Sequence, residues 1–111
     1  MLLLWAPVLA MINSLVEELV ARNSLLSALE PHFGARQAIF ASAVIFGIGH
    51  WNSLPSGALG VLMTSALGYF AAKAMIETRG MFWSWFMHVV PDCVIFYYWG
   101  IGALNRRDWG A

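Results

Sequence analysis

Four side chains that could carry hydrolytic chemistry stand in otherwise apolar stretches of this sequence: Glu17, His50, His88 and Asp92. His88 and Asp92 are four residues apart, so on a helix they project from one face about 6 Å apart. A carboxylate beside a histidine can activate water as a general base. Glu17, His50 and His88 also form a ligand set of catalytic zinc sites, in which one position stays open for water. The residue types therefore indicate a hydrolytic site, either with a divalent metal, zinc by preference, or without a metal.

A second charged pair, Glu18 and Arg22, follows Glu17 in the first apolar stretch. At i and i+4 the two side chains share a helix face and can pair, while Glu17 is rotated away by roughly 100°. A charge near the centre of a bilayer costs at least ~2.5–3.5 kcal/mol, so such residues indicate function. The alternative is a solvated patch on an amphipathic surface helix. That alternative predicts a whole polar face, yet only Asn13 and Ser14 are polar before this patch.

Each histidine taken alone is more often a satisfied core residue than a functional group. Together with the two carboxylates they place four polar side chains on three hydrophobic segments. Burial without partners would cost several kcal/mol in total, so we expect the four to face one another in one cavity. We assign Cys93 to packing, because it lies about 100° around the helix from Asp92. We expect His32, in a Pro- and Gly-containing loop, to face solvent.

The composition indicates a membrane protein. Of 111 residues, 60% are hydrophobic and 11% are charged, against about 25% charged residues in a typical soluble domain. Six basic and six acidic residues balance, which argues against nucleic acid as a partner. The single cysteine excludes an internal disulfide. The apolar start has neither a basic region nor a small-residue cleavage site, so we interpret it as a spanning helix whose beginning was lost by truncation.

Four apolar segments separated by short polar or Pro- and Gly-containing breaks predict four membrane helices. They cover about residues 2–29, 36–51, 58–76 and 81–104, with a polar tail at 105–108. We expect Pro31 and Gly34 to end the first helix and Pro91 to kink the last one. The second segment is short for a span of ~20 residues, so its His50 end should stop inside the membrane or line a cavity. The sequence thus predicts an all-α, polytopic membrane protein with a four-helix core, forming one domain over residues 1–111.

The third segment carries a stripe of small side chains that predicts close helix packing. The stripe recurs every four residues and consists of Gly60, Thr64, Gly68 and Ala72. Such stripes let membrane helices approach closely, so that van der Waals packing stabilises the bundle.

The order of three motifs, each on its own predicted membrane helix, resembles the CPBP intramembrane proteases, also called the Abi family. This family includes the CAAX prenyl endopeptidases and the bacteriocin-processing or self-immunity proteins. The motifs are EExxxR (Glu17, Glu18, Arg22), FxxxH (Phe46, His50) and HxxxD (His88, Asp92). The segment 77–83 also looks like the short loop that leads into the last motif helix of the family. The resemblance covers essentially the whole chain, as the catalytic core.

The resemblance implies roles for the motif residues. Glu17 and His50 would hold and activate the attacking water, while His88 and Asp92 would stabilise the oxyanion or complete a metal site. Glu18 and Arg22 would brace the first helix. The family has been described both as metalloproteases and as glutamate-dependent enzymes, and the sequence leaves both open.

Two departures from the family pattern bear on this reading. The family usually has further membrane helices before the first motif, which implies a fragment or a minimal member here. It also often has Asn where this chain has Asp92. An ionised carboxylate only accepts hydrogen bonds, so we favour a ligand or orienting role for Asp92 over an oxyanion donor.

The resulting prediction is an intramembrane endopeptidase, located in the cell membrane if the protein is bacterial. Its partners would be the lipid bilayer and a peptide or protein substrate, lipidated in the CAAX type of reaction. The reaction would be of the CAAX type or of the bacteriocin or self-immunity type. Two other functions stay open: a non-catalytic scaffold or immunity protein with the same fold, and a small ion or solute transport subunit, because intramembrane carboxylates also mark ion paths.

Overall fold

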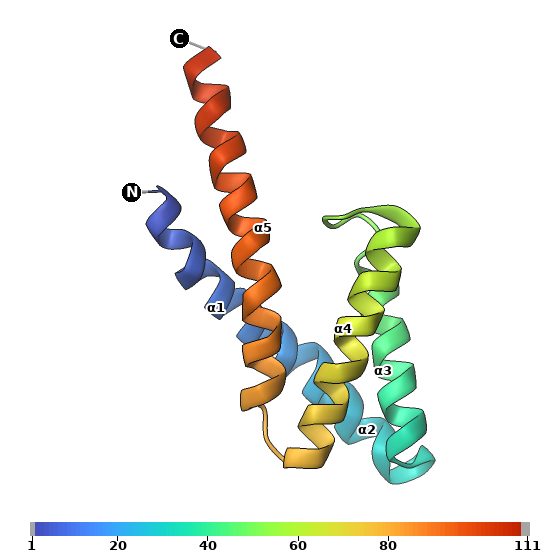
Figure 1. The fold of residues 1–111 in the computed structure, drawn as a ribbon. Helices are drawn as coiled ribbons and strands as arrows, with labels where there is room; N and C mark the ends of the chain where they lie inside the picture. Colours follow the sequence, from blue (N-terminus) through green and yellow to red (C-terminus); the bar gives the residue numbers. More distant parts are fainter. Residues whose placement is uncertain (1, 110–111) are drawn as a thin grey trace.

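The chain folds into helices joined by short connections, as the apolar segments predict (Figure 1). The computed structural model describes residues 2–109, and the side chains of residues 3–106. It is 89% helical, with no strand among the described residues. Three helices are long and apolar enough to cross a membrane, and a shorter apolar helix accompanies them. The prediction of an all-α membrane protein with a four-helix core is confirmed.

The first predicted helix is one continuous rod in the structure. It comprises a short 3₁₀ turn η1 (Leu2–Trp5), α1 (Ala6–Glu17), the π-helical η2 (Glu18–Asn23) and α2 (Ser24–Phe33). Pro31 lies inside α2, so the prediction that it helps to end the helix is wrong. Proline removes only one amide donor there. The rod ends instead at Gly34, whose φ of 82° suits a residue without Cβ, and whose amide donates to the Glu30 carbonyl.

The π-helical turn η2 contains Glu18 and Arg22 of the first motif. The sequence pattern did not predict this turn. Glu18 opens this turn and Arg22 lies in its last part. π-turns within α-helices are rare and occur frequently at functional sites. Here the turn lies where the rod passes the other helices, and both charged residues are buried there.

The helices α3 (Ala35–Gly49) and α4 (Gly57–Thr78) form an antiparallel hairpin. They approach closely along the predicted small-residue stripe, in which Gly60, Gly68 and Ala72 are buried. A Cβ built on Gly68 would lie 3.1 Å from the Phe46 ring, so a larger residue would push α3 away. With 15 residues, α3 is only about 22 Å long. Its end at His50 therefore lies short of a full membrane crossing, as predicted.

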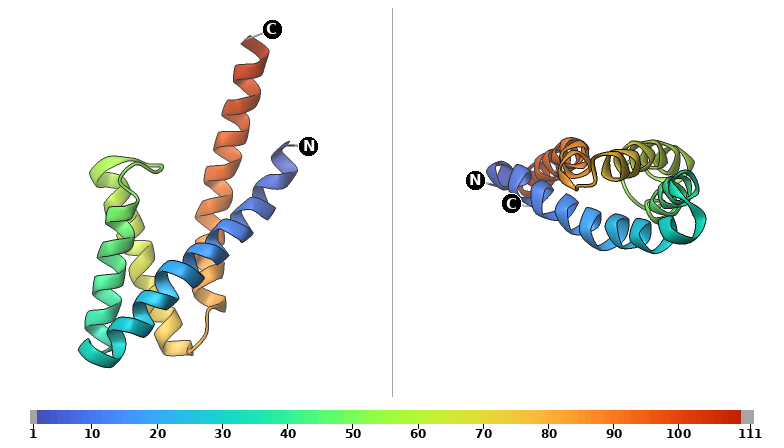
Figure 2. Two further views of the ribbon diagram at one scale, coloured as in Figure 1. Left: turned by 180° about the vertical axis from the view of Figure 1, so that it is seen from behind. Right: turned by 90° about the horizontal axis from the view of Figure 1, so that it is seen from below.

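The last helix, α5 (Phe82–Trp109), packs mainly against α1 and also against α4. It is continuous through Pro91 and includes the expected polar tail, of which the side chains from residue 107 onwards lie outside the described residues. The rod of α1, η2 and α2 runs obliquely across one face of α5 and α4 to the base of α3 (Figures 1 and 2). The N-terminal half of the rod and α5 therefore diverge from the α3–α4 hairpin, and a gap between the two pairs opens toward one end.

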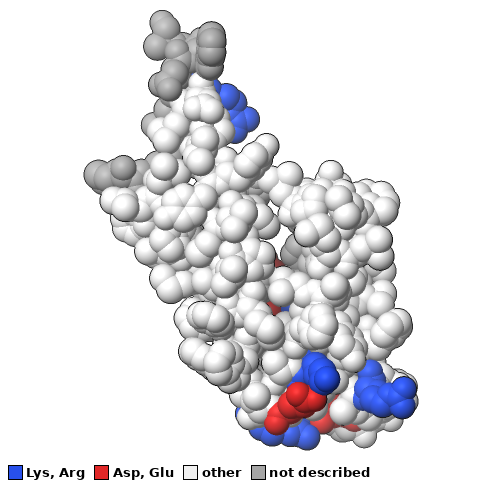
Figure 3. All heavy atoms as spheres, viewed as in Figure 1, with Lys and Arg blue, Asp and Glu red and all other residues white. Residues whose placement is uncertain are grey.

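Charged side chains gather at the end of the molecule where α2 meets α3 and α4 meets α5 (Figure 3). The ion pairs there are Arg79 with Glu30, 3.1 Å apart, and Lys73 with Glu77, 3.7 Å apart. Most of the remaining visible surface carries no charge, as expected for a face that contacts lipid. Acidic and basic atoms are also visible in a hollow at the middle of the molecule.

Candidate active site

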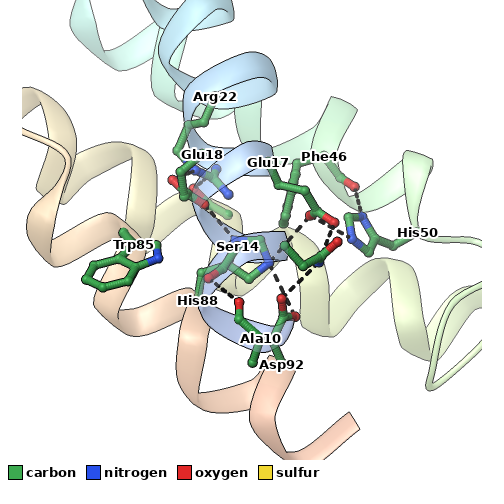
Figure 4. Close-up of polar contacts among 12 residues, drawn as sticks. Ala10, Ser14, Glu17, Glu18, Arg22, Phe46, His50, Trp85, His88 and Asp92 are labelled. Atoms are coloured by element: carbon green, nitrogen blue, oxygen red, sulfur yellow. Dashed lines mark hydrogen bonds and ion pairs between the residues drawn. The ribbon is translucent and has the colours of Figure 1, made fainter. Parts of the chain in front are cut away.

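The structure brings the four predicted site residues together around one cavity (Figure 4). The last residue of α1 supplies Glu17, the first residue after α3 supplies His50, and α5 supplies His88 and Asp92. The cavity has a volume of about 360 Å³ and lies between α1, α5 and the α3–α4 hairpin. The four residues were expected to meet because none of them can be left facing lipid.

Glu18 lies beside this cavity, in a fully buried cluster. Its carboxylate accepts from Arg22 Nε at 2.6 Å, from the Ser84 hydroxyl, and from His88 Nδ1 at 2.8 Å. Arg22 also donates from Nη1 to the Gly68 carbonyl at 2.9 Å. These contacts join η2 to α4 and α5, and they surround the buried carboxylate with donors.

Two of the contacts that Glu18 makes go beyond what the sequence predicted. The pairing of Glu18 with Arg22 was expected, but its bond to His88 and the participation of Ser84 were not. A signal for Ser84 was present, since it stands at i−4 from His88 and so shares its helix face. Glu18 therefore both braces the first helix and orients a histidine of the candidate site.

The ring of His50 is held by the backbone of its own helix. Its Nδ1 lies 2.7 Å from the Phe46 carbonyl oxygen, which can only accept a hydrogen bond. Nδ1 therefore carries a proton, and in the neutral ring Nε2 presents a lone pair toward the cavity. The same logic applies to His88, whose Nδ1 donates to Glu18 and whose Nε2 faces the cavity. The side chain of Phe46 packs on both rings, with centroid distances of 4.4 Å to His50 and 5.4 Å to His88.

Glu17 has one carboxylate oxygen without a hydrogen-bond partner. This oxygen, Oε2, is buried and lies 3.6 Å from His50 Nε2 and 3.5 Å from His88 Nε2. With both rings neutral, these are contacts between two acceptors, and a doubly protonated ring would instead form an ion pair with Glu17. A water in the adjoining cavity that donates one hydrogen bond to Oε2 and one to a histidine Nε2 would bridge the two acceptors.

The other oxygen of Glu17 and the carboxylate of Asp92 share one donor, Asn13. Its Nδ2 lies 3.0 Å from Glu17 Oε1 and 3.0 Å from Asp92 Oδ2. The second oxygen of Asp92, Oδ1, lies 3.6 Å from His88 Nε2. The sequence pattern marks Asn13 only as a polar residue in the first segment. Its position four residues before Glu17 was the available signal, but its bond to Asp92 depends on how α1 packs on α5.

The donor types at the cavity match zinc. The ligand atoms of a tetrahedral zinc site lie about 3.4 Å apart, and the two distances from Glu17 Oε2 to the histidine Nε2 atoms are close to this. However, within residues 2–109 no group of three or more His, Cys, Asp or Glu side chains meets the geometry of a metal site. Glu17, His50 and His88 thus match zinc in donor type and in two of their distances, but their donor atoms do not form a complete metal site.

The remaining candidates lie away from the cavity. Cys93 is half-buried and lines a shallow apolar groove on another face of α5, with Val90 and Val94. His32 is exposed in α2, although it lies in a helix and not in the expected loop.

An α-helical membrane bundle in which Glu, His, His and Asp converge on one cavity defines a class of intramembrane proteins with a polar site between their helices. The family described as type II CAAX prenyl endopeptidase Rce1-like matches residues 1–94 of this chain. The chain belongs to this family, which confirms the resemblance to the CPBP proteins. It is an integral membrane protein. No curated protein and no solved structure gives a significant match.

Proposed function

We propose that the protein is an intramembrane endopeptidase that hydrolyses a peptide bond of a prenylated, CAAX-type substrate. The observation that carries the proposal is the unpaired Glu17 Oε2, buried in a cavity and facing Nε2 of both His50 and His88. A buried carboxylate oxygen without a hydrogen-bond partner lowers the stability of the fold. Its retention is explained if it acts on a molecule that enters the cavity.

Glu17 and His50 are the pair that would activate water. A water molecule between them can donate one hydrogen bond to Glu17 Oε2 and the other to His50 Nε2. Glu17 then takes a proton as the water oxygen attacks the scissile carbonyl carbon. The resulting tetrahedral intermediate collapses when the carbon–nitrogen bond breaks and the carboxyl group returns the proton to the leaving amine.

His88 and Asp92 would act on the substrate carbonyl from α5. An oxyanion needs N–H donors aimed at the position where charge develops. His88 Nε2 can supply one when both ring nitrogens carry protons, and Asp92 Oδ1, 3.6 Å away, would orient it. The bond from His88 Nδ1 to Glu18 fixes the plane of the ring for this task.

The family and the walls of the cavity support this substrate class. The family description names CAAX prenyl endopeptidases. Away from the polar cluster, the cavity is lined by apolar side chains of the α3–α4 loop, α4 and α5, among them Leu54, Met63, Leu67, Ile95 and Phe96. An apolar channel beside a hydrolytic cluster suits a peptide with a hydrophobic or lipidated C-terminal end.

A divalent metal is the alternative source of the activated water. Glu17, His50 and His88 would hold it, zinc being the choice of this donor set, and it would supply a polarised water and a Lewis acid. The proton transfers assigned to Glu17 above do not require it. A strong chelator followed by metal analysis of the purified protein separates the two: loss of activity that zinc restores supports the metal.

Hydrolysis is tested with the purified full chain in lipid vesicles and a farnesylated CAAX peptide as the probe. We expect mass spectrometry to find one cut, with one ¹⁸O atom from labelled water in the new carboxylate. A mock preparation from cells without the protein controls for contaminating proteases. No cut in the farnesylated peptide or in its non-prenylated form would contradict the proposal and favour the scaffold function. Ion flux in the same vesicles, without cleavage, would favour the transport function.

A further inference from the structure

Asn13 contacts both carboxylates of the candidate site with a single amide group. It stands on α1, four residues before Glu17, and lines the same cavity. Its Nδ2 donates to Glu17 Oε1 at 3.0 Å and to Asp92 Oδ2 at 3.0 Å, joining α1 to a residue 79 positions away. An amide nitrogen has two hydrogens, so both are used by these two bonds.

The chemistry of the partners fixes the orientation of this amide. Ionised carboxylates only accept hydrogen bonds, so the opposite orientation would turn the Asn13 carbonyl oxygen toward two other acceptors. With both hydrogens engaged, Asn13 has none left for a substrate oxyanion. Its influence on the reaction would therefore pass through the two carboxylates.

Each of the two bonds occupies one oxygen of a carboxylate and leaves the other oxygen facing the histidines. In Glu17, Oε1 is held by Asn13 and Oε2 is left facing both histidines. In Asp92, Oδ2 is held by Asn13 and Oδ1 is left facing His88 Nε2. Figure 4 shows Glu17 and Asp92 directed into the same space from α1 and α5.

We propose that Asn13 is a positioning residue for the hydrolysis, which sets the direction of Glu17 and Asp92 together. This inference rests on the proposed function. Small errors in the position of a reacting group are costly in rate, so fixing both carboxylates with one group gives a defined gap between Glu17, His50 and His88. The residue lies outside the three motifs of the family.

The kinetic test replaces Asn13 with leucine, which is nearly isosteric but cannot donate. We expect Asn13→Leu to lower kcat about 10–100-fold, as the loss of a group that orients a site residue typically does, with little change in KM. Asn13→Gln keeps the amide on a longer arm and should regain part of the loss. Asn23→Leu is the matched control, since Asn23 is half-buried on the same rod but lines a different cavity. A kcat for Asn13→Leu equal to that of Asn23→Leu would overturn the proposal.

A second readout is independent of activity. In ¹⁵N-labelled wild-type protein, the side-chain amide of Asn13 is identified as the pair of resonances missing from Asn13→Leu. Glu17→Gln should move one of its two proton resonances, and Asp92→Asn should move the other. If neither moves, Asn13 does not hold the carboxylates and the proposal fails, whatever the activity. If both move but the wild-type protein cleaves no peptide, the proposed function fails while the arrangement of the carboxylates holds.

Discussion

Two neighbouring glutamates occupy opposite environments at the middle of the first helical rod. The side chain of Glu18 has no exposed surface, and three donors from η2 and α5 surround it. The side chain of Glu17 is 30% exposed and keeps one oxygen unpaired toward the cavity. We call the group around Glu18 the closed cluster, because both oxygens of its carboxylate have donors and only Arg22 Nη2 lacks a hydrogen-bond partner. The group around Glu17 is the open cluster.

The two clusters differ in their roles: the closed cluster stabilises the fold, and the open cluster is available for chemistry. A buried charge whose partners are complete holds helices in place, and removing one partner leaves the rest uncompensated. An incompletely paired charge beside a cavity adds little stability, but it is free to bind a water or a substrate group. His88 connects the two, because its Nδ1 belongs to the closed cluster and its Nε2 to the open one.

The largest effect is expected from breaking the open cluster at His50. His50→Gln removes the nitrogen that shares a water with Glu17, and the loss of a general acid–base partner typically costs about 10²–10⁴-fold in rate. The fold should survive, because the side chain is 24% exposed at the end of α3. The measurement is kcat for the farnesylated peptide, with the exposed His32→Gln as control. Full activity in His50→Gln would remove this residue from the mechanism.

Breaking the closed cluster should lower stability instead. Arg22→Ala removes the bonds to Glu18 and to the Gly68 carbonyl and leaves a buried carboxylate short of a partner, which costs about 3–5 kcal/mol. The free energy of unfolding is measured by titrating the protein in mixed micelles with a denaturing detergent. Arg79→Ala breaks the exposed pair with Glu30 and should cost only about 0–1 kcal/mol. Equal losses in the two variants would show that the cluster around Glu18 is not closed.

Asp92→Asn sharpens the assignment within the open cluster. Asparagine can still accept from Asn13, so the fold should be kept. If Asp92 orients His88 or binds a metal, activity should fall about 10–100-fold, and this is the result we expect. The profile is measured from about pH 5 to about pH 9, with and without a chelator. A variant that is fully active and indifferent to the chelator would assign position 92 to oxyanion donation in a metal-free reaction.

The smallest effect is expected at Ser84, the lesser donor of the closed cluster. Ser84→Ala removes one hydrogen bond from an uncharged hydroxyl to the Glu18 carboxylate. This should cost about 1.5–3 kcal/mol, less than the loss of Arg22, because Arg22 and His88 remain bound. The same detergent titration measures it, with the exposed Ser24→Ala as control. A loss as large as that of Arg22→Ala would mean that the serine, and not the arginine, holds the carboxylate.

The sequence was sufficient to predict the helices and the convergence of the motif residues on one cavity. Long apolar runs can cross a membrane only as helices. The polar residues on three of them, spaced at i and i+4 on two, must turn inward. The pairing of Glu18 with Arg22 followed from this spacing alone, and the structure has it at 2.6 Å. The small-residue stripe of α4 likewise predicted where the α3–α4 hairpin packs.

The details that divide the closed cluster from the open one depend on tertiary packing. The bonds from Asn13 to Asp92 and from His88 to Glu18 join residues about seventy or more positions apart, so local spacing carries no signal for them. The π-helical turn at Glu18 has no counterpart in the sequence pattern, and its two charged residues bond to α4 and α5. The helix continues past Pro31 and ends at Gly34, where the chain adopts a positive φ.

Glu17→Gln tests the central claim most directly, because it removes the base and keeps the shape of the side chain. The cleavage rate of the farnesylated peptide and the free energy of unfolding are measured on the same preparation in lipid. We expect loss of detectable cleavage with a free energy of unfolding close to that of the wild-type protein. Glutamine keeps an oxygen to accept from Asn13 in place of Oε1, and Oε2 has no hydrogen-bond partner to lose. Retained cleavage, or a loss of stability like that of Arg22→Ala, would contradict the assignment of Glu17 to chemistry and Glu18 to structure.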